Sequence, residues 1–378
     1  MKHLEAPYSG VKCYVEKGNL IIQSKKPFKV LSSAVLNGGL CFAKTILNHQ
    51  VSKDFNNPNP ETYLKNIVEK LSLPQPVVGL MTAVNIQNLS VKTDRYEKER
   101  FISVFVTAGL SNSATAGDPI TIPNTPKNTI NIIVLVDGNL SDACMVEVVK
   151  TVTEAKTTAL RELDVRSSFS RKVATGTTTD AVVVACTGNG KPISYAGVST
   201  KLGRTLSLNV NRAVKEAVRR EEGLVSNRPL IKRLEELGIT LDDLLEAVME
   251  LLVYHPSMGN KKEVLRVLRE EFYEAMSDVN VASLIMAGIR LEEDSKNGLI
   301  PNMESKVFNK DPVFLLADEI LGLNIANYIA GSKGIFEFVR FDKAKPGILK
   351  KLGPFLDDVI GGLAAGVSSS MYTKLLKK

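Results

Sequence analysis

The sequence has no tryptophan, three histidines and four cysteines among its 378 residues. The cysteines, at positions 13, 41, 144 and 186, stand far apart and form no C-x-x-C spacing. Neither a zinc site nor a disulfide framework is therefore indicated. Reduced thiols are the simple interpretation, and they favour a cytoplasmic protein.

Long apolar runs are also missing. No uninterrupted apolar stretch reaches the roughly 18 residues of a membrane span, and no apolar run follows the first basic residues of the N-terminus. We therefore expect a cytoplasmic location. Residues 313–376 are rich in small residues, which leaves peripheral membrane contact open.

The net charge leaves more than one class of ligand open. Lysine and arginine number 48 against 41 acidic residues, which gives a net charge of +7 and a pI of about 9.0. Such a balance attracts anionic phosphates or nucleic acid. The basic residues are scattered, however, and no helix-turn-helix, zinc pattern or basic run interleaved with aromatics is present, so nucleic-acid binding is not favoured. A phosphorylated small ligand explains the charge as well.

The first half of the chain alternates between strand and helix signals. A helix capped by Ser141 is expected to run to about Leu163, and a second is expected over residues 200–222. Runs rich in β-branched residues, bounded by glycine, asparagine and proline, predict strands at residues 30–36, 77–84, 102–107, 129–136 and 181–186. These elements predict an α/β or α+β domain with a mixed sheet over residues 1–222.

A boundary follows at residues 223–229. Gly223 is suited to end a helix, and Asn227 can cap the next one ahead of Pro229. Beyond this linker, periodic apolar residues predict helices at 230–237, 241–254, 262–276 and 279–291. Residues 230–378 are therefore expected to form an all-α second domain. The oligomeric state stays open, a homo-oligomer included.

Three polar clusters lie in the small-residue-rich C-terminal sequence: ADEILG, FDKAKPG and LDDVIGG. They contain Asp318, Glu319, Asp342, Lys345, Asp357 and Asp358. Burying unpaired carboxylates among leucines is costly, whereas Mg²⁺ takes a few carboxylates together with substrate phosphate. The pattern favours a metal-dependent phosphate site. The alternative is that the acids are helix N-caps or a solvated face.

Residues 228–378 resemble the phosphatidylglycerophosphatase A superfamily, through ADEILG, FVRFDKAKPG and FLDDVIGGLAAG in that order. The resemblance implies a Mg²⁺-dependent phosphatase, and the soluble archaeal branch of the superfamily implies alpha-ribazole-5'-phosphate as substrate. The hypothesis assigns Mg²⁺ binding to four aspartates: Asp318, Asp342, Asp357 and Asp358.

Two further residues of this region receive roles. Glu319 is expected to support the metal ligands or to act as a base, and Lys345 to steady phosphate oxygens. Because Lys345 precedes proline, its backbone is expected to be extended. The alternative for Lys345 is an ordinary surface lysine whose stem covers apolar surface.

The first half carries a second set of motifs: VTAGLSNSATAGDP, NTINIIVLVDG, TEAKTTALREL and ATGTTTDAVVVA, preceded by LSSAVLNGGL. In this order they resemble the adenosylcobinamide amidohydrolase family. Thr178 departs from the pattern, because a second glycine is expected there. The resemblance implies hydrolysis of the amide that joins the aminopropanol arm of adenosylcobinamide to the corrin ring, which releases adenosylcobyric acid.

The chemistry of this half must be sought among few titratable groups. A Ser/His/Asp triad would depend on His49 with Ser111 or Ser113, and a lone histidine is more often structural. A carboxylate base is more economical: Asp118, Glu154 or Asp180 could activate water or a Thr/Ser hydroxyl. Lys156 follows Glu154 by two positions, so only one of the two can face a site on this helix.

Substrate contacts are expected from the two glycine-rich loops, whose backbone N–H groups would stabilise the oxyanion. The candidates are Gly109, Asn112, Thr175, Gly176 and Thr177. Asn112 could bond a substrate amide, or it could simply be a turn residue.

The two resemblances together imply a bifunctional hydrolase of corrinoid salvage and cobalamin biosynthesis. Two alternatives stay open. The first is a phosphatidylglycerophosphate phosphatase with an accessory domain, and the second is a corrinoid-binding protein without catalysis.

Overall fold

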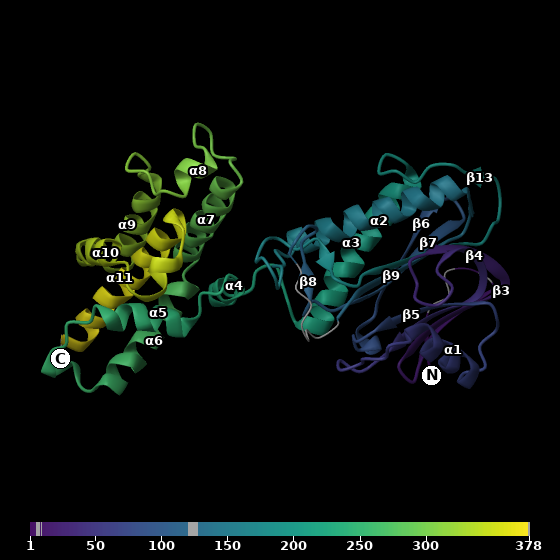
Figure 1. Ribbon diagram of the computed structural model, residues 1–378, viewed down its shortest axis with the longest axis horizontal. Coiled ribbons are helices and arrows are strands. Elements are labelled where there is room, and N and C mark those ends of the chain that lie inside the picture. Colours follow the sequence, from purple (N-terminus) through teal and green to yellow (C-terminus); the bar gives the residue numbers. More distant parts are fainter. Residues whose placement is uncertain (5–7, 9, 120–127, 377–378) are drawn as a thin grey trace. The chain divides into compact units, whose positions relative to one another are not determined.

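The structure is a computed structural model that describes residues 1–4, 8, 10–119 and 128–376. The chain divides into two compact units, Met1–Ser226 and Asn227–Lys378 (Figure 1). The division falls within residues 223–229, where Gly223 ends a helix in the left-handed conformation (φ 65°). Each unit is described by itself as the N-terminal or the C-terminal unit.

The N-terminal unit contains a nine-stranded mixed sheet with the order β1-β2-β3-β12-β9-β7-β6, in which β4 pairs with β3 and β5. Its strands are β1 (Lys2–Leu4), β2 (Val11–Glu16), β3 (Asn19–Ser32), β4 (Gly39–Gln50), β5 (Val77–Thr82), β6 (Ser90–Glu97), β7 (Arg100–Ala108), β9 (Ile130–Val136) and β12 (Ala181–Cys186). The sheet branches at β3, whose register with β4 shifts between Gln23 and Phe28. Its first part pairs with β2 and its last part with β12.

Two helices cover one face of this sheet, α2 (Asp142–Glu162) and α3 (Lys201–Glu222), and Figure 1 shows them side by side. Alternate residues of the central strands, such as Val104 and Val134, pack against them, whereas Phe105 and Ile133 point to the other face and pack against Phe28. This alternation is the period of two that a strand imposes. Helix α1 (Pro60–Lys70) packs on a third, smaller apolar cluster.

The mixed-sheet prediction for the N-terminal unit is confirmed, since β12 runs parallel to β9 and β5 parallel to β4 while the other pairs of the nine-stranded sheet are antiparallel. Four predicted strands correspond to β5, β7, β9 and β12. The strand predicted at residues 30–36 is wrong at its end, because β3 stops at Ser32. Strands β2, β4 and β6 were not predicted.

The C-terminal unit is all helical, as predicted. Its elements are α4 (Leu230–Glu236), α5 (Leu241–Glu250), η2 (Pro256–Met258), α6 (Lys261–Ser277), α7 (Val279–Lys296), α8 (Ser305–Phe308), α9 (Ala317–Ala330), α10 (Ser332–Ala344), η3 (Gly347–Lys351) and α11 (Pro354–Leu376). Within residues 230–376 and in the other described segments, none of the helices combines the length and the apolarity needed to cross a bilayer.

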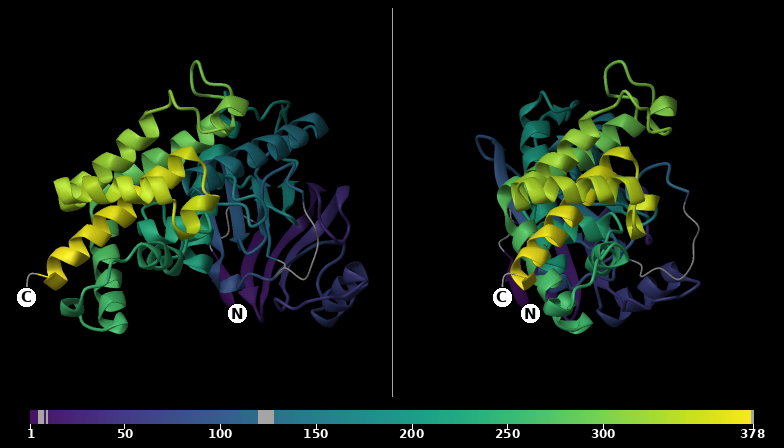
Figure 2. Two further views of the ribbon diagram at one scale, coloured as in Figure 1. Left: turned by 60° about the vertical axis from the view of Figure 1, so that its left-hand side comes forward. Right: turned by 90° about the vertical axis from the view of Figure 1, so that its left-hand side faces the viewer.

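Helix α11 forms the centre of this unit, and its residues 357–369 are all buried. It lies beside α9 and α10 in Figures 1 and 2. Where α11 crosses α9, the main chains of the two helices contact each other. A Cβ on Gly322 would lie 2.4 Å from the carbonyl oxygen of Asp358, and one on Gly362 would lie 2.2 Å from that of Gly322. Glycine at both positions lets the two helices touch without intervening side chains.

Candidate functional site

The crossing of α9 and α11 brings three carboxylates together in the C-terminal unit. Asp318 and Glu319 stand in the first turn of α9, and Asp358 stands near the start of α11. Each offers an oxygen that lies within 4.8 Å of the other two. We call these three residues the carboxylate trio. Asp318 is 0% exposed and Asp358 is 5% exposed, so two of the three carboxyl groups are shielded from water.

The trio has unmet bonding capacity. Within the described residues, neither Asp318 Oδ2 nor Glu319 Oε2 has a hydrogen-bond partner. Burial, reinforced by the neighbouring Glu319, raises the pKa of Asp318, and burial followed by the charge of Asp357 raises the pKa of Asp358 to about 8. Buried oxygens that lack partners are costly, and oxygens of this type are the donors that a hard divalent cation takes. The trio therefore fits Mg²⁺.

Lys345 and Asp357 form an ion pair beside the trio. The Lys345 ammonium lies 2.6 Å from Asp357 Oδ2 and 3.2 Å from Asp311 Oδ2. Burial raises the pKa of Asp357 to about 6 although the lysine opposes the shift. Burial by itself would lower the pKa of Lys345, but the bonds to Asp357 and Asp311 raise it overall. Lys345 is thus a partnered cation among carboxylates.

The backbone of Lys345 corrects one prediction. It is left-handed (φ 44°, ψ 59°) and not extended, because Lys345 caps α10 and donates its N–H to the carbonyl of Phe341. The bond that closes the helix end therefore outweighs the restriction from Pro346. This geometry returns the side chain towards Asp357 in the first turn of α11.

The predicted set of four aspartate ligands is divided by the structure. Asp318 and Asp358 belong to the trio, and Glu319 joins them. Asp357 bonds Lys345, and Asp342 lies in the last turn of α10, where burial raises its pKa against the opposing charge of Lys345. Asp342 and Asp357 lie close enough to the trio for their charges to act on Asp358, and Asp357 Oδ1 also has no hydrogen-bond partner among the described residues.

In the N-terminal unit, polar groups converge on Asp180, which precedes β12. Its Oδ1 accepts the Thr177 hydroxyl at 2.5 Å, the Thr177 N–H at 3.1 Å and the Ile130 N–H at 3.1 Å. Its Oδ2 accepts the ammonium of Lys156. The lysine and aspartate side chains are only 11% and 15% exposed. Here a buried charge pair is held by both side-chain and backbone donors.

Gly176 is required at this convergence. A Cβ there would lie 2.4 Å from Asp180 Oδ2 and 2.7 Å from Lys156 Nζ. The charged groups of Lys156 and Asp180 therefore lie directly against the main chain of the Gly/Thr turn, residues 174–180. The short strand β11 (Gly176–Thr177) pairs with β8 (Ser113–Ala114) and so holds the two glycine-rich loops together.

Asn112 lies in the loop that begins at Gly109, and it is almost wholly buried. Its Nδ2 donates to the Thr178 hydroxyl at 2.7 Å, whereas its Oδ1 has no partner among the described residues. Thr178, where a glycine was expected, has no left-handed backbone. Its side chain therefore costs no strain and supplies the partner for Asn112.

Asp118, another carboxylate predicted for this half, bonds groups outside the Lys156–Asp180 pair. Asp118 Oδ2 accepts the Thr115 N–H at 2.8 Å and the Ser167 hydroxyl at 2.6 Å. Burial opposes its ionisation, but the bonds from serine hydroxyls outweigh that effect and lower the pKa of Asp118. This carboxylate closes its own turn at Thr115 and joins it to the segment that contains Ser167. Glu154 is exposed, on the side of α2 opposite Lys156.

Thr175 and Gly109 have structural contacts. The Thr175 hydroxyl accepts the Ala116 N–H at 2.9 Å. A Cβ on Gly109 would lie 2.7 Å from the amide of Asn128, so this glycine admits the close approach of another loop. Both residues therefore shape the loops around Asn112.

Of Glu154 and Lys156, between which the sequence left the choice open, Lys156 is the one that is buried. A signal was present, because Lys156 follows Val152 by four positions and precedes Ala159 by three on the buried face of α2. A lysine in such a stripe requires a buried partner.

His49 does not form a triad. Its Nδ1 lies 2.7 Å from Asn19 Oδ1 and its Nε2 lies 3.1 Å from the Tyr63 hydroxyl. Ser113 donates to the carbonyl of Arg166. Burial lowers the pKa of His49, which favours a neutral imidazole with a structural role.

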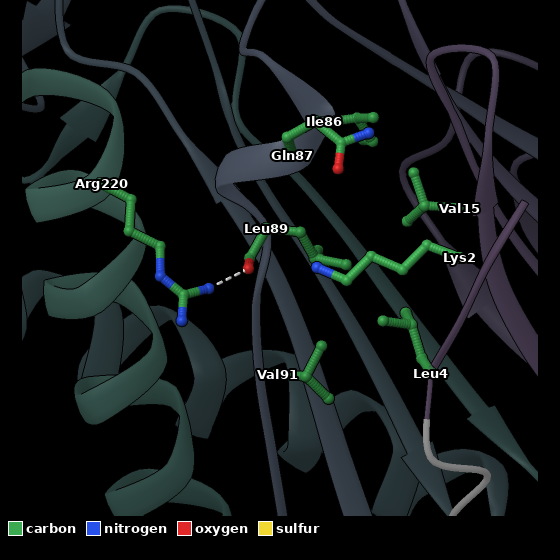
Figure 3. A pocket seen from close by; sticks show the side chains of 8 residues that line it. All are labelled: Lys2, Leu4, Val15, Ile86, Gln87, Leu89, Val91 and Arg220. Atoms are coloured by element: carbon green, nitrogen blue, oxygen red, sulfur yellow. Dashed lines mark hydrogen bonds between the residues drawn. The ribbon is translucent and has the colours of Figure 1, made fainter.

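A separate cavity of about 170 Å³ lies between the first strands and β6 (Figure 3). Leu4, Val15 and Val91 line it, and Arg220 reaches the carbonyl of Leu89 at its rim. The cavity is smaller than the sites that enclose drug-sized ligands, and it includes none of the predicted site residues.

Comparison with known proteins agrees with this division. The family model described as adenosylcobinamide amidohydrolase matches residues 5–226, and the one described as phosphatidylglycerophosphatase A matches residues 264–373. The adenosylcobinamide amidohydrolase of Methanosarcina mazei is 34% identical over 211 residues, which cover 53% of this chain and 94% of that protein.

Two further relatives are similar to parts of the chain. An uncharacterized protein of Methanocaldococcus jannaschii is 37% identical over 132 residues, which cover 34% of this chain and 99% of that protein. The low temperature requirement C protein of Listeria monocytogenes has a solved structure with 30% identity and a TM-score of 0.34, covering 38% of this chain and 93% of that one. Because the first family match extends over more than half of its length, the chain belongs to the adenosylcobinamide amidohydrolase family, with a phosphatidylglycerophosphatase A-like region on its C-terminal side.

Proposed function

We propose that the chain is a hydrolase with two active sites. The N-terminal unit hydrolyses the amide between the aminopropanol arm and the corrin ring of adenosylcobinamide, and adenosylcobyric acid is released. The C-terminal unit removes the phosphate of alpha-ribazole-5'-phosphate in a reaction that needs Mg²⁺. The observation that carries the second activity is the carboxylate trio, with its buried oxygens that lack partners.

The family match and the relative in Methanosarcina mazei support the amidohydrolase activity. The Lys156–Asp180 pair is its chemical centre, because a carboxylate held by a lysine is a fixed acceptor for a proton from the attacking group. Asn112 contributes a buried carbonyl oxygen with no partner among the described residues. That oxygen suits the N–H groups of the amide side chains around a corrin ring.

In the C-terminal unit, Asp318, Glu319 and Asp358 would hold Mg²⁺. A bound Mg²⁺ supplies charge stabilisation at a phosphoryl oxygen and a more acidic water. Lys345 contributes a fixed positive charge beside these carboxylates, and this charge offsets their repulsion of an incoming phosphate. Asp357 positions that ammonium.

The presence of both units on one chain supports the choice of alpha-ribazole-5'-phosphate. Aminopropanol amides and ribazole phosphates both belong to the nucleotide side of cobamide chemistry, so one protein would act on both parts. The match to phosphatidylglycerophosphatase A favours lipid phosphate as the second candidate.

The test uses the purified full chain in three reactions. Adenosylcobinamide is followed by mass spectrometry for adenosylcobyric acid and aminopropanol, and phosphate release is measured from alpha-ribazole-5'-phosphate and from phosphatidylglycerophosphate, with Mg²⁺ or with a chelator. We expect the first two reactions to proceed. Phosphate release from the lipid alone would replace the ribazole assignment.

Paired variants assign each activity to its unit. Asp180→Asn should abolish amide hydrolysis and leave phosphate release unchanged, and Asp318→Asn should do the reverse. Loss of both activities in either variant would contradict two independent sites.

A further inference from the structure

One hydroxyl of the Gly/Thr turn differs from its neighbours. Thr177 donates its hydroxyl to a carboxylate, Asp180 Oδ1, at 2.5 Å. The Thr178 hydroxyl accepts the Asn112 amide, and the Thr179 hydroxyl donates to the carbonyl of Asn128. Among the three consecutive threonines of this turn, Thr177 is therefore the one whose proton points at a basic oxygen.

Burial places Thr177 at the boundary of the charge pair. Lys156 is buried, Thr177 and Asp180 are both half-buried, and Thr178 beside them is exposed. A substrate carbonyl can therefore approach the hydroxyl from the solvent side while the carboxylate remains behind it. Such an ordered arrangement of nucleophile, base and orienting group is the pattern of nucleophilic catalysis.

We infer that Thr177 is the nucleophile of the amidohydrolase reaction, with Asp180 as its base and Lys156 as a positioning residue. This inference rests on the proposed hydrolysis of adenosylcobinamide. Lys156 holds Asp180 Oδ2, which fixes the carboxylate so that Oδ1 faces Thr177. Gly176 leaves the space in which both charged groups reach the turn.

The reaction balances without a cofactor. The Thr177 oxygen bonds to the amide carbon while its proton passes to Asp180 Oδ1. The C–N bond then breaks, and that proton leaves with the aminopropanol nitrogen. The corrin carboxyl remains as an ester on Thr177. A water molecule gives a proton to Asp180 and its oxygen to the carbonyl carbon, and the ester C–O bond breaks. Adenosylcobyric acid leaves, and the Thr177 oxygen recovers its proton from Asp180.

A bond between a hydroxyl and a carboxylate three residues apart can also serve only to close a turn. The two roles predict different results for three variants: Thr177→Ala, Thr177→Ser and the matched control Thr179→Ala. Adenosylcobinamide hydrolysis by the full chain is measured by aminopropanol release, with thermal unfolding as the check on folding. We expect Thr177→Ala to lose at least about 10³-fold in kcat/KM. Thr177→Ser should stay within about 10-fold of the unmodified chain, because it keeps the oxygen, and Thr179→Ala should be unchanged.

A second measurement detects the ester itself. The reaction is stopped by acid within the first turnover, and the protein is digested and weighed by mass spectrometry. We expect the added mass of the adenosylcobyryl group on the peptide that contains Thr177, in the unmodified chain and in Thr177→Ser. Full activity of a folded Thr177→Ala would overturn the nucleophile while the proposed function stands. Absence of aminopropanol release from the unmodified chain would overturn the proposed function and the nucleophile with it.

Discussion

Lys345 and Asp357 join the end of α10 to the start of α11 through a bond of 2.6 Å, and the aspartate is nearly buried. The lysine reaches this position because its backbone turns left-handed at the helix end. The same ion pair therefore connects two helices of the C-terminal unit and places a positive charge beside its proposed site.

Replacing Lys345 with alanine should leave Asp357 buried and unpaired. Because the lysine is 35% exposed, we expect a loss of about 1–2 kcal/mol, below the cost of breaking a fully buried pair. The measurement is urea unfolding of the full chain, followed in the transition of the C-terminal unit. Lys343→Ala, an exposed lysine of the same helix, is the control. Equal stability of the two variants would contradict the role of the pair.

Mg²⁺ should stabilise the C-terminal unit if the carboxylate trio binds it. At a concentration one hundred times the Kd, we expect about 2.7 kcal/mol of added stability, measured as a rise in melting temperature that a chelator reverses. Asp318→Asn should remove this rise. Asp242→Asn, at an exposed acid of α5, should keep it. An unchanged rise in Asp318→Asn would place the ion elsewhere.

Gly322→Ala should separate α9 from α11, because its methyl group would meet the carbonyl oxygen of Asp358. We expect a loss of about 1–3 kcal/mol, typical of overpacking, together with loss of Mg²⁺-dependent phosphate release. Gly361→Ala is the matched control, since its nearest contact would be an ordinary 3.7 Å. That variant should be neutral or more stable by up to about 1 kcal/mol.

His49 should make stability depend on pH. Burial lowers its folded pKa, whereas the imidazole of the unfolded chain titrates near about 6.5. The unfolded state therefore binds more protons below that value, and stability falls as the pH decreases from 7 towards the folded pKa, by up to about 1.4 kcal/mol per pH unit. Denaturation midpoints at several pH values should show this slope.

Two variants isolate the contribution of His49. His49→Gln should reduce the slope and still hydrolyse adenosylcobinamide, whereas His3→Gln, at an exposed histidine, should change neither property. Complete loss of amide hydrolysis in a folded His49→Gln would contradict the structural role and indicate that His49 acts in catalysis.

Local patterns predicted much of the fold. The apolar runs of β9 and β12 and the periodic helices of the C-terminal unit follow directly from the sequence. Strand β4 was not predicted, because its buried residues include the polar Thr45, Asn48 and His49. Asn48 is satisfied by Thr107 and Asn131 on other strands. Such polar residues look like loop positions until the partner strands are known.

The candidate sites were also predicted only in part. The sequence drew attention to the acids of the C-terminal unit because they interrupt apolar helices. It could not sort them, since the crossing at Gly322 and Gly362 decides which carboxylates meet. The choice between Glu154 and Lys156 stayed open for a related reason. The burial of Lys156 depends on Asp180, a partner 24 residues away in the turn before β12.

The contact between the main chains of α9 and α11 also bears on how this site could be re-engineered. The separation of Asp318 and Asp358 is set by two backbones in direct contact. The volumes of side chains elsewhere in the unit therefore have little effect on that separation. Repacking the distant leucines and valines for heat resistance should therefore leave the spacing of the carboxylates intact. A designer could change the stability of the unit and the ligands of its site as nearly independent variables.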